Sequence, residues 1–346
     1  MDFSRIVGPL LSWYEGNARV LPWRNDPTPY RVWVSEIMLQ QTRVEAVKPY
    51  FERFVREVPD IAALARLPEE RLLKLWEGLG YYSRARNLKK AAQAVAEQYG
   101  GSLPADAREL RKLPGIGEYT AGAVASIGFG LPEPAVDGNV LRVASRLAAS
   151  HRDISNPAVK RELAGELRKV YPSGRAGAFT QSLMELGATV CIPNGEPLCD
   201  KCPLSSRCEG RKTGEAASLP VTAPKPARKT EERTVFLILC GEAVAVRRRP
   251  ETGLLAGLWE FPCAPGRLSP GEAEEQLSEW GLSAPEIQPL PSAKHVFTHL
   301  EWRMSGFLAR VPERNAGFAW PERTRFFRDY ALPSAYRVYL GCLKKL

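Results

Sequence analysis

Four cysteines close together in sequence constrain this chain more than any other feature. Cys191, Cys199, Cys202 and Cys208 follow the order C-x7-C-x2-C-x5-C in one short segment of the 346-residue sequence. Four thiolates on one loop can surround a single inorganic centre, either a tetrahedral zinc ion or an iron–sulfur cluster. Structural zinc sites usually divide their ligands into two close pairs, whereas this segment has one close pair with a single cysteine on each side. We therefore favour a [4Fe–4S] cluster over zinc.

Length and composition predict a globular protein of about two domains. The sequence is 44% hydrophobic and 25% charged, and no window approaches the run of apolar residues that a membrane-spanning helix needs, so we expect no membrane partner. The N-terminus lacks the regions of a secretory signal, and seven cysteines without such a signal fit a reducing, cytoplasmic compartment. A net charge of +9 favours a polyanionic partner, although charge alone is a weak signal.

The hydrophobic pattern changes once along the chain. Residues 1–210 show the three- and four-residue spacing of helices, and residues 211–233, rich in Pro, Ala, Lys and Thr, predict a linker. Residues 234–346 predict an α+β domain. Its expected elements are strands at 235–240 and 243–249, a helix at 270–281, paired strands within 295–311 and a final helix at 334–346.

Glu36 is the first candidate for chemistry. Thr28 and Pro29 form a helix start, and Glu36 falls inside that helix among apolar neighbours. Burial would raise the pKa of its carboxyl group and keep it protonated, as a general acid requires. The alternative is a glutamate on the helix surface that pairs with Arg31 or Arg43.

Asp137 is a second candidate, before Gly138 and a new helical pattern. It could simply cap that helix. Two carboxyl groups that converge on one cleft would instead fit cleavage of a glycosidic bond, one as acid and the other stabilising a cationic sugar. The sequence leaves both possibilities open.

Two further segments suggest contact with nucleic acid. In residues 105–130, helical spacing is interrupted by LPGIG, where Gly115 and Gly117 permit positive φ and close approach of another molecule. This pattern is typical of a helix–hairpin–helix module that binds a DNA backbone, or of a purely architectural corner. The segment LGYYSRARNLKKA, residues 79–91, combines aromatic rings with cations, which suits base stacking and phosphate contacts or a solvated charged helix.

Taken together, these motifs resemble a known family. SEIMLQQT, LGYYSRARN, LPGIGEYTAGA, VDGNV and the four-cysteine segment occur in the order seen in the A/G-mismatch adenine DNA glycosylases of MutY type, within the helix–hairpin–helix glycosylase superfamily. The resemblance covers residues 5–210, and GLLAGLWEFP and HVFTHLEW agree with its C-terminal part. It implies an all-α catalytic domain followed by a Nudix-like α+β domain.

The resemblance also implies roles for single residues. Glu36 would protonate N7 of adenine, Asp137 would stabilise the oxocarbenium ion, and Tyr119 and Asn139 would support the sugar and the reacting water. Further residues are implied to contact adenine or DNA: Trp23, Arg24, Leu39 and Gln181 in the adenine pocket, Gln41 and Tyr81 as wedges in the duplex, Gly115 and Gly117 at the backbone, and Phe297, Thr298 and His299 in a loop that senses 8-oxoguanine.

The same resemblance implies cofactor and partners. We expect one [4Fe–4S] cluster per chain, held by the four cysteines. The protein is expected to be a monomer that acts in base excision repair on double-stranded DNA with A:8-oxoG or A:G mispairs. It would be associated with the nucleoid if the source is bacterial. The first cysteine spacing is seven residues, one more than the family's usual six. The C-terminal domain lacks the RExxEE signature of a Nudix hydrolase, which favours recognition over catalysis.

Three other functions compete with this one. An endonuclease III-like glycosylase/lyase for oxidised pyrimidines would need a lysine nucleophile where this chain has Tyr119, and that family lacks an equivalent of Glu36. A non-catalytic DNA-binding scaffold would leave Glu36 without a role. A nucleotide pyrophosphatase would act through residues 234–346.

Overall fold

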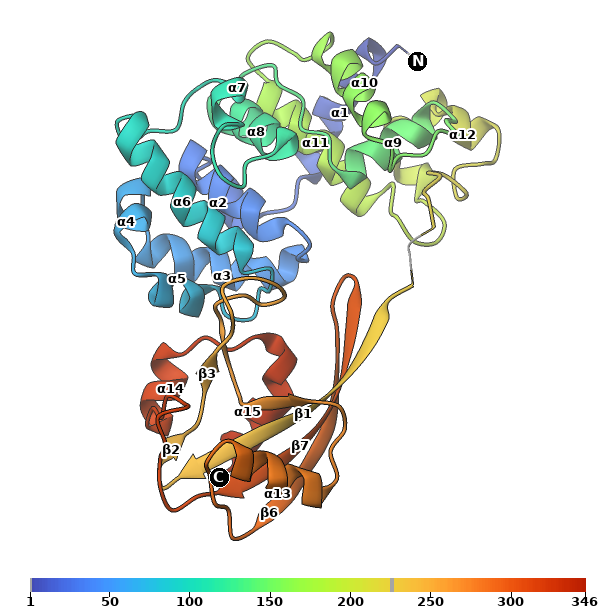
Figure 1. The fold of residues 1–346 in the computed structure, drawn as a ribbon. Helices are drawn as coiled ribbons and strands as arrows, with labels where there is room; N and C mark the ends of the chain where they lie inside the picture. The colour runs from blue at the N-terminus through green and yellow to red at the C-terminus, as the bar shows by residue number, and fades with distance from the viewer. Residues whose placement is uncertain (1, 225–226) are drawn as a thin grey trace. The chain divides into compact units, whose positions relative to one another are not determined.

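The computed structural model describes residues 2–224 and 227–346 and divides into two compact units (Figure 1). Unit 1 comprises Met1–Leu67 and Arg86–Pro224, and unit 2 comprises Pro68–Ala85 and Lys225–Leu346. The segment 68–85 therefore shares its contacts with the C-terminal part of the chain, although the sequence pattern groups it with the helical residues. Within the described residues, no helix has the length and apolar character needed to cross a membrane.

Unit 1 is helical, as the spacing of its apolar residues predicts. Its elements are α1 (Ser4–Asn17), η1 (Pro22–Arg24), α2 (Pro29–Leu39), α3 (Val44–Glu57), α4 (Ile61–Arg66), most of α6 (Ser83–Gln98), α7 (Ala107–Leu110), α8 (Glu118–Ala123), η2 (Val124–Gly128), α9 (Gly138–Leu147), α10 (Pro157–Arg168), α11 (Ala176–Thr189), η3 (Cys199–Lys201), η4 (Ser205–Arg207) and α12 (Glu209–Lys212).

Side-chain caps explain where several of these helices begin. The Thr28 hydroxyl accepts from the amide of Arg31 at the start of α2, and the Asp137 carboxylate accepts from the amide of Val140 at the start of α9. Each cap satisfies an amide that has no partner within the helix. The expected start of the helix that carries Glu36 is thus confirmed.

One core of unit 1 joins helices from both ends of its sequence. Leu10 of α1, Val143 of α9 and Phe179 of α11 are buried in the same apolar cluster, together with Leu204 and Cys208 of the cysteine segment. The cysteine loop is therefore packed into this core, and any change in the loop acts directly on α9 and α11.

Unit 2 is an α+β unit built on a mixed sheet. The strands are β1 (Lys229–Cys240), β2 (Ala243–Val244), β5 (Cys263–Pro265), β6 (Ile287–Val296) and β7 (Leu300–Arg310), with β3 (Arg247–Arg248) and β4 (Trp259–Glu260) in a second small sheet. The main order is β2-β1-β7-β6, where β1 and β7 are parallel and β6 and β7 antiparallel, and β5 also pairs with β1.

Successive side chains of β1 point to opposite faces of the sheet, and helices pack against the apolar side chains on both faces. Phe236 and Ile238 pack with α13 (Pro270–Glu279), whereas Leu237 and Leu239 pack with α14 (Arg323–Asp329) and α15 (Arg337–Leu343). The remaining elements are α5 (Glu69–Trp76) and η5 (Ser334–Tyr336).

Two hydrogen bonds show why residues 68–85 belong to unit 2. The Lys74 ammonium donates to the carbonyl of Tyr330 at 3.0 Å, and the amide of Leu332 donates to the carboxylate of Glu77 at 2.9 Å. The segment that carries Tyr81 is therefore held by the C-terminal residues.

The predicted elements of the C-terminal part agree with the structure only in part. The expected helix at 270–281 is α13, and β7 lies within the expected 295–311, but β6 begins at Ile287, before the predicted strand pair. The strand expected at 243–249 is divided into β2, which pairs with β1, and β3, which pairs with β4 in the second sheet. Within the predicted linker 211–233, α12 ends at Lys212 and β1 begins at Lys229. The start of the predicted linker is packed in unit 1, where Ala216 and Leu219 are buried and the carbonyl of Leu219 accepts from the Arg146 guanidinium at 2.9 Å.

Candidate active site

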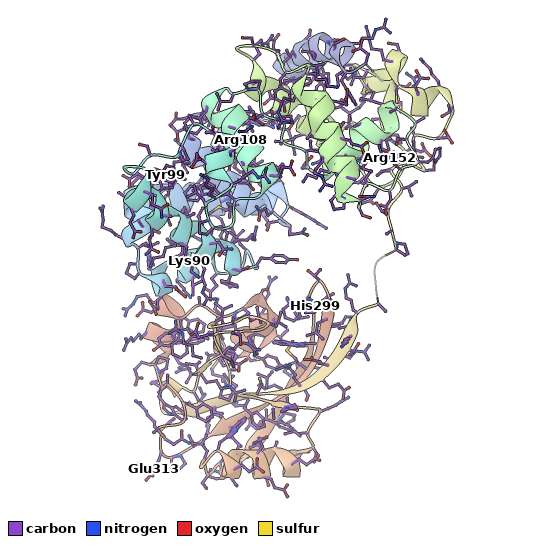
Figure 2. All side chains as sticks on the ribbon, turned by 45° about the horizontal axis from the view of Figure 1, so that its top comes forward. Lys90, Tyr99, Arg108, Arg152, His299 and Glu313 are labelled. Carbon is purple, nitrogen blue, oxygen red and sulfur yellow. The ribbon has the colours of Figure 1, made fainter. Side chains whose placement is uncertain are left out.

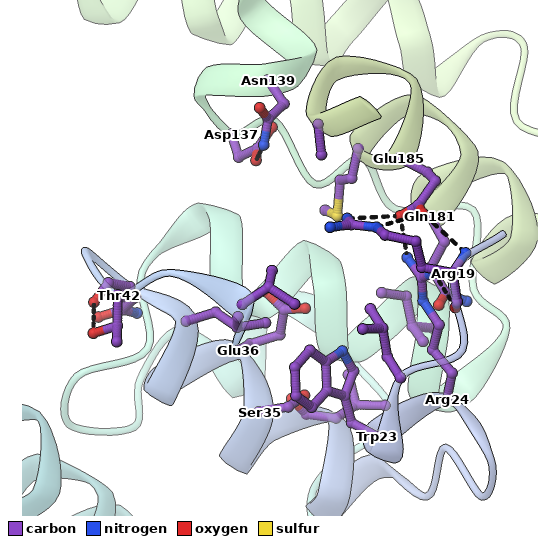
Figure 3. A pocket seen from close by; sticks show the side chains of 18 of the residues that line it. Arg19, Trp23, Arg24, Ser35, Glu36, Thr42, Asp137, Asn139, Gln181 and Glu185 are labelled. Carbon is purple, nitrogen blue, oxygen red and sulfur yellow. Dashed lines mark hydrogen bonds and ion pairs between the residues drawn. The ribbon is translucent and has the colours of Figure 1, made fainter. Parts of the chain in front are cut away.

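A cavity of about 440 Å³ in unit 1 brings together residues from several helices (Figure 3). Its volume lies within the usual range for small-molecule pockets, about 300–1,000 Å³. The lining includes most residues that the sequence singled out for catalysis and adenine binding: Trp23, Arg24, Glu36, Leu39, Gln41, Tyr119, Asp137, Asn139 and Gln181.

Glu36 is buried at the wall of this cavity, with 6% of its surface exposed. The Tyr119 hydroxyl donates a hydrogen bond to its carboxyl group. Burial raises the pKa of Glu36 to about 7; the Tyr119 hydrogen bond and Arg24 act in the opposite direction, and Asp137 adds to the increase. The alternative of a surface glutamate paired with an arginine is wrong, since Glu36 is buried.

Asp137 faces the same cavity from the start of α9. Its Oδ1 accepts from the amide of Val140 at 2.8 Å, and its Oδ2 accepts from the Asn139 side chain at 2.7 Å. Burial raises the pKa of this carboxyl group, while these hydrogen bonds lower it. The interpretation of Asp137 as a helix cap is confirmed, and Asp137 also lines the cavity that contains Glu36. Its catalytic role stays a prediction.

Arg24 is held at the cavity wall by Glu185, which the sequence analysis did not single out. A guanidinium nitrogen of Arg24 donates to Glu185 at 2.8 Å, and another donates to the carbonyl of Arg19 at 2.9 Å. Arg19 also donates to Glu185, and all three residues line the cavity. One signal was present in the sequence, because Glu185 follows Gln181 by one helical turn on α11.

Arg142 is another residue that the sequence analysis missed. Its guanidinium donates to the Asn139 side chain at 2.9 Å, to the carbonyl of Gly187 at 2.7 Å and to the carbonyl of Cys191 at 2.8 Å. One turn later, Arg146 donates to the carbonyl of Ile192 at 2.8 Å. The start of the cysteine segment is thus tied to the helix that carries Asn139.

The four cysteines of the segment line one small cavity in unit 1, together with Arg146 and Arg211. Burial raises the pKa of Cys202 to about 11. Within the described part of the chain, no three His, Cys, Asp or Glu side chains are arranged to hold a single metal ion. The chemistry of the donor set nevertheless fits a thiolate-bound centre, because four thiols and two cationic side chains surround one space.

The two glycines of LPGIG differ in backbone conformation. Gly115 has a φ of 77°, and a Cβ there would lie 2.7 Å from the Cβ of Asn87 on α6, so this position requires glycine. Gly117 caps α8 with a φ of −86°, and the space around it is open. The expectation of positive φ is therefore confirmed for Gly115 and wrong for Gly117, which any residue could occupy by its backbone alone.

The two predicted wedge residues share a strained backbone. Gln41 has a φ of 59° and Tyr81 a φ of 49°, a conformation that is uncommon for residues other than glycine and concentrates at functional sites. Gln41 lines the cavity of unit 1, whereas Tyr81 belongs to unit 2 and is 47% exposed. The structure therefore assigns these two residues to different units.

In unit 2, the predicted sensing residues form the turn between β6 and β7, and His299 lies at its tip (Figure 2). The Phe297 ring packs edge-on against Trp302, with ring centres 4.9 Å apart. The Thr298 hydroxyl lies 3.1 Å from the hydroxyl of Tyr81. On α13, the Glu272 carboxylate accepts from Ser269 in a capping box, so this carboxylate is engaged in capping the helix.

Both units are similar to known proteins. Residues 34–169 match the family model of the HhH-GPD superfamily base excision DNA repair proteins, and residues 234–341 match the NUDIX domain. The chain is 27% identical to a thermostable thymine-DNA glycosylase, with a TM-score of 0.54 over 60% of this chain and 96% of that one. It is 26% identical to endonuclease III in a non-covalent DNA complex, with a TM-score of 0.52 over 62% of this chain and 99% of that one.

Curated relatives extend the similarity to both units. The adenine DNA glycosylase of Mus musculus is 34% identical over 98% of this chain and 78% of its own length. The adenine DNA glycosylase of Homo sapiens is 37% identical over 98% of this chain and 75% of its own length. Because these relatives match nearly the whole chain, and the two family models match its helical and Nudix-like parts, the chain belongs to the adenine DNA glycosylase family.

Proposed function

We propose that this protein hydrolyses the N-glycosidic bond of adenine mispaired with 8-oxoguanine or guanine in double-stranded DNA. The observation that carries the proposal is the pairing of Glu36 and Asp137 in one cavity. Glu36 is buried and accepts one hydrogen bond, from a hydroxyl, whereas Asp137 is half-buried and accepts hydrogen bonds from a backbone amide and from a side-chain amide. Such unequal environments divide two carboxyl groups into an acid and an anion.

The proposed reaction begins with proton transfer. Glu36 gives its proton to N7 of an extruded adenine, the bond from N9 to C1′ of the deoxyribose breaks, and its electron pair leaves with the base. The C1′ centre becomes an oxocarbenium ion, which the Asp137 carboxylate stabilises, either as an ion pair or as a transient covalent adduct. A water molecule then adds to C1′, releasing Asp137 where an adduct has formed, and gives its proton to the Glu36 carboxylate, which restores the acid and leaves an abasic site. Tyr119 and Asn139 hold the two carboxyl groups through the hydrogen bonds described above.

Recognition is divided between the two units in this proposal. Trp23, Arg24, Leu39 and Gln181 contact the extruded adenine, and Gln41 and Tyr81 enter the duplex where it has left the stack. Extrusion costs a few kcal/mol and less at a mispair, which favours mispaired adenine. Phe297, Thr298 and His299 contact the opposite 8-oxoguanine, and Gly115 and Gly117 approach the DNA backbone.

We further propose that Cys191, Cys199, Cys202 and Cys208 hold one [4Fe–4S] cluster. The cluster organises the loop, which carries Lys201 and Arg207 toward DNA phosphates, and takes no part in bond cleavage. The protein acts as a monomer in the cytoplasm, and on the nucleoid if its source is bacterial.

The proposal is tested by single-turnover assays in which abasic sites are converted to strand breaks by alkali. Duplexes with A opposite 8-oxoguanine, G and T should be cleaved fast, slowly and not at all, respectively. Glu36→Gln should bind the mispaired duplexes yet release no adenine, because an amide has no proton of suitable acidity to donate. Substantial turnover by Glu36→Gln would refute the role of Glu36, and intact binding without any alkali-labile site would indicate a DNA-binding scaffold.

Two controls address the other functions. A lyase forms a Schiff base with the sugar, so borohydride should trap no covalent enzyme–DNA complex on a duplex with an oxidised pyrimidine. The full chain with magnesium should release no phosphate from nucleoside triphosphates if unit 2 acts only in recognition.

A further inference from the structure

Glu185 is a fully buried carboxylate that takes no part in the proposed bond cleavage. It lies on α11 with none of its side chain exposed. Its two oxygens accept from the Arg19 amide at 3.0 Å, from the Arg19 guanidinium at 2.7 and 3.0 Å and from the Arg24 guanidinium at 2.8 Å. These four hydrogen bonds use the whole accepting capacity of a carboxylate, so the position of Glu185 is fixed by both arginines.

Arg24 in turn is fixed by Glu185. It lies at the end of η1, a single short turn between α1 and α2, where the backbone alone gives little rigidity. Its guanidinium donates to Glu185 and to the carbonyl of Arg19, and lies 5.5 Å above the centre of the Tyr14 ring. Figure 3 shows Glu185 and Gln181 on the same helix, facing the cavity beside Arg24. Glu185 therefore sets the distance between two predicted adenine contacts.

The same contacts affect the charge of the cavity. Around Glu36 lie Tyr119 from α8, Asp137 at the start of α9 and Arg24 from η1, and the wider cavity adds Arg19, Glu185 from α11 and Arg43 before α3. Arg24 opposes protonation of Glu36. With Glu185 ionised, the group of Arg19, Arg24 and Glu185 carries a net charge of +1; without that carboxylate it would carry +2.

Glu185 is ionised throughout the pH range in which the enzyme could work. Burial opposes its ionisation, but the hydrogen bonds from Arg19 and Arg24 outweigh burial and lower its pKa to about 2. Its negative charge is thus a constant feature of the cavity wall.

We propose that Glu185 is a positioning residue of the glycosylase cavity: it fixes the Arg24 guanidinium beside Gln181 and balances the arginine charge that faces the Glu36 and Asp137 carboxyl groups. The adenine that enters this cavity becomes cationic when it is protonated, and the sugar becomes cationic when the bond breaks. A cavity wall with a net charge of +1 repels these two cations less than a wall with a net charge of +2, so the Glu185 carboxylate stabilises both of them. This inference rests on the proposed role of Glu36 as the acid.

The test is the pH dependence of the single-turnover rate on A:8-oxoG duplex. Glu185→Gln leaves the shape of the side chain and removes its charge, so the high-pH limb of the profile should move to lower pH by about half a unit or more. Glu185→Asp keeps the charge but shortens the side chain, so the limb should stay in place while the rate falls. Arg19→Gln lowers the positive charge, so the limb should move to higher pH.

A matched control exists in unit 2. Glu260 is also buried and paired with two arginines, Arg247 and Arg249. It is not among the residues that line the cavity, so Glu260→Gln makes the same chemical change and should leave the limb in place. If Glu185→Gln lowers the rate by one factor at every pH, the residue only stabilises the fold and the proposal is overturned. If the Glu185→Gln variant does not fold, the Arg19→Gln variant is sufficient for the test: a high-pH limb that moves to lower pH in Arg19→Gln overturns the proposal.

The outcomes separate this proposal from the proposed function. A wild-type protein that excises no adenine, or a Glu36→Gln variant that does, refutes the function or the role of the acid whatever Glu185 does. The role of Glu185 alone would be refuted by a combination of three results. The wild-type profile would have a high-pH limb, Glu36→Gln would have no turnover, and the limb would not move in Glu185→Gln.

Discussion

At the scale of single residues, Glu36 and Asp137 show how one cavity gives two carboxyl groups different properties. Burial raises the pKa of both. Asp137 accepts hydrogen bonds from an amide and from Asn139, which favour its anion, whereas Glu36 has a single hydroxyl partner and a pKa of about 7. Because the two groups interact, the limbs of a pH profile belong to the pair.

The first prediction concerns that profile. If Glu36 must be protonated and Asp137 ionised, the single-turnover rate should be bell-shaped in pH. The rate should fall as pH rises through about 7, because Glu36 loses its proton. It should also fall in acid, because the raised pKa of Asp137 makes this carboxyl group bind a proton at a higher pH than a free aspartate does. A rate that increases steadily above pH 8 would contradict the assignment of Glu36.

A second prediction isolates the Tyr119 hydrogen bond. This bond favours the ionised form of Glu36 and so lowers its pKa. Tyr119→Phe should therefore raise the pKa of Glu36 and move the high-pH limb to higher pH, in the opposite direction to Glu185→Gln. The same assay measures it, and a limb that moves to lower pH would show that the hydroxyl serves another purpose. Tyr50→Phe, an exchange at a tyrosine outside the cavity lining, is the control.

At the scale of elements, the turn between α7 and α8 depends on Gly115. Gly115→Ala would place a Cβ 2.7 Å from Asn87 and force a left-handed conformation on alanine, which together should lower the free energy of unfolding by about 2–4 kcal/mol. Gly130→Ala shares the positive φ but meets open space, so it should lower that free energy by only about 1–2 kcal/mol. Urea unfolding compares them, and equal losses would show that the Asn87 contact is unimportant.

The turn between β6 and β7 makes another prediction. Thr298→Val keeps the shape of the side chain and removes its hydroxyl. Loss of one hydrogen bond worth about 1 kcal/mol should reduce the ratio of rates on A:8-oxoG and A:G duplexes about fivefold, with the A:G rate nearly unchanged. Thr230→Val, at an exposed position on β1, should not change the ratio. Equal loss on both duplexes would count against a sensing role.

The elements also show what the sequence could and could not predict. Helical spacing and the Thr28 cap predicted α2, and the residue pattern of 295–311 predicted β7, because these signals are local; most of β6, which begins at Ile287, was not predicted. Contacts across the chain had no such signal. Arg19 and Glu185 are 166 residues apart in sequence, and each alone is an ordinary charged residue. The left-handed backbone of Gln41 and Tyr81 was equally hidden, since neither is a glycine or asparagine.

At the scale of the whole molecule, the cysteine segment links the proposed cofactor site to the core and to the cavity. Its residues Leu204 and Cys208 are buried with α9 and α11. Arg142 and Arg146 of α9 donate to its carbonyl groups at Cys191 and Ile192. A centre bound by the four thiols would therefore stabilise α9, the helix that begins at Asp137 and carries Asn139.

Removal of one thiol tests this link. Cys202→Ala should abolish the iron and sulfide that we expect in the purified protein, and amide hydrogen exchange of α9 should become faster, because the loop no longer closes around a cluster. Cys263→Ala removes a thiol that is buried in unit 2, so it should keep full iron content and unchanged exchange in α9. Iron retained by Cys202→Ala would remove this residue from the ligand set, and one zinc ion per wild-type chain would replace the cluster with a tetrahedral site.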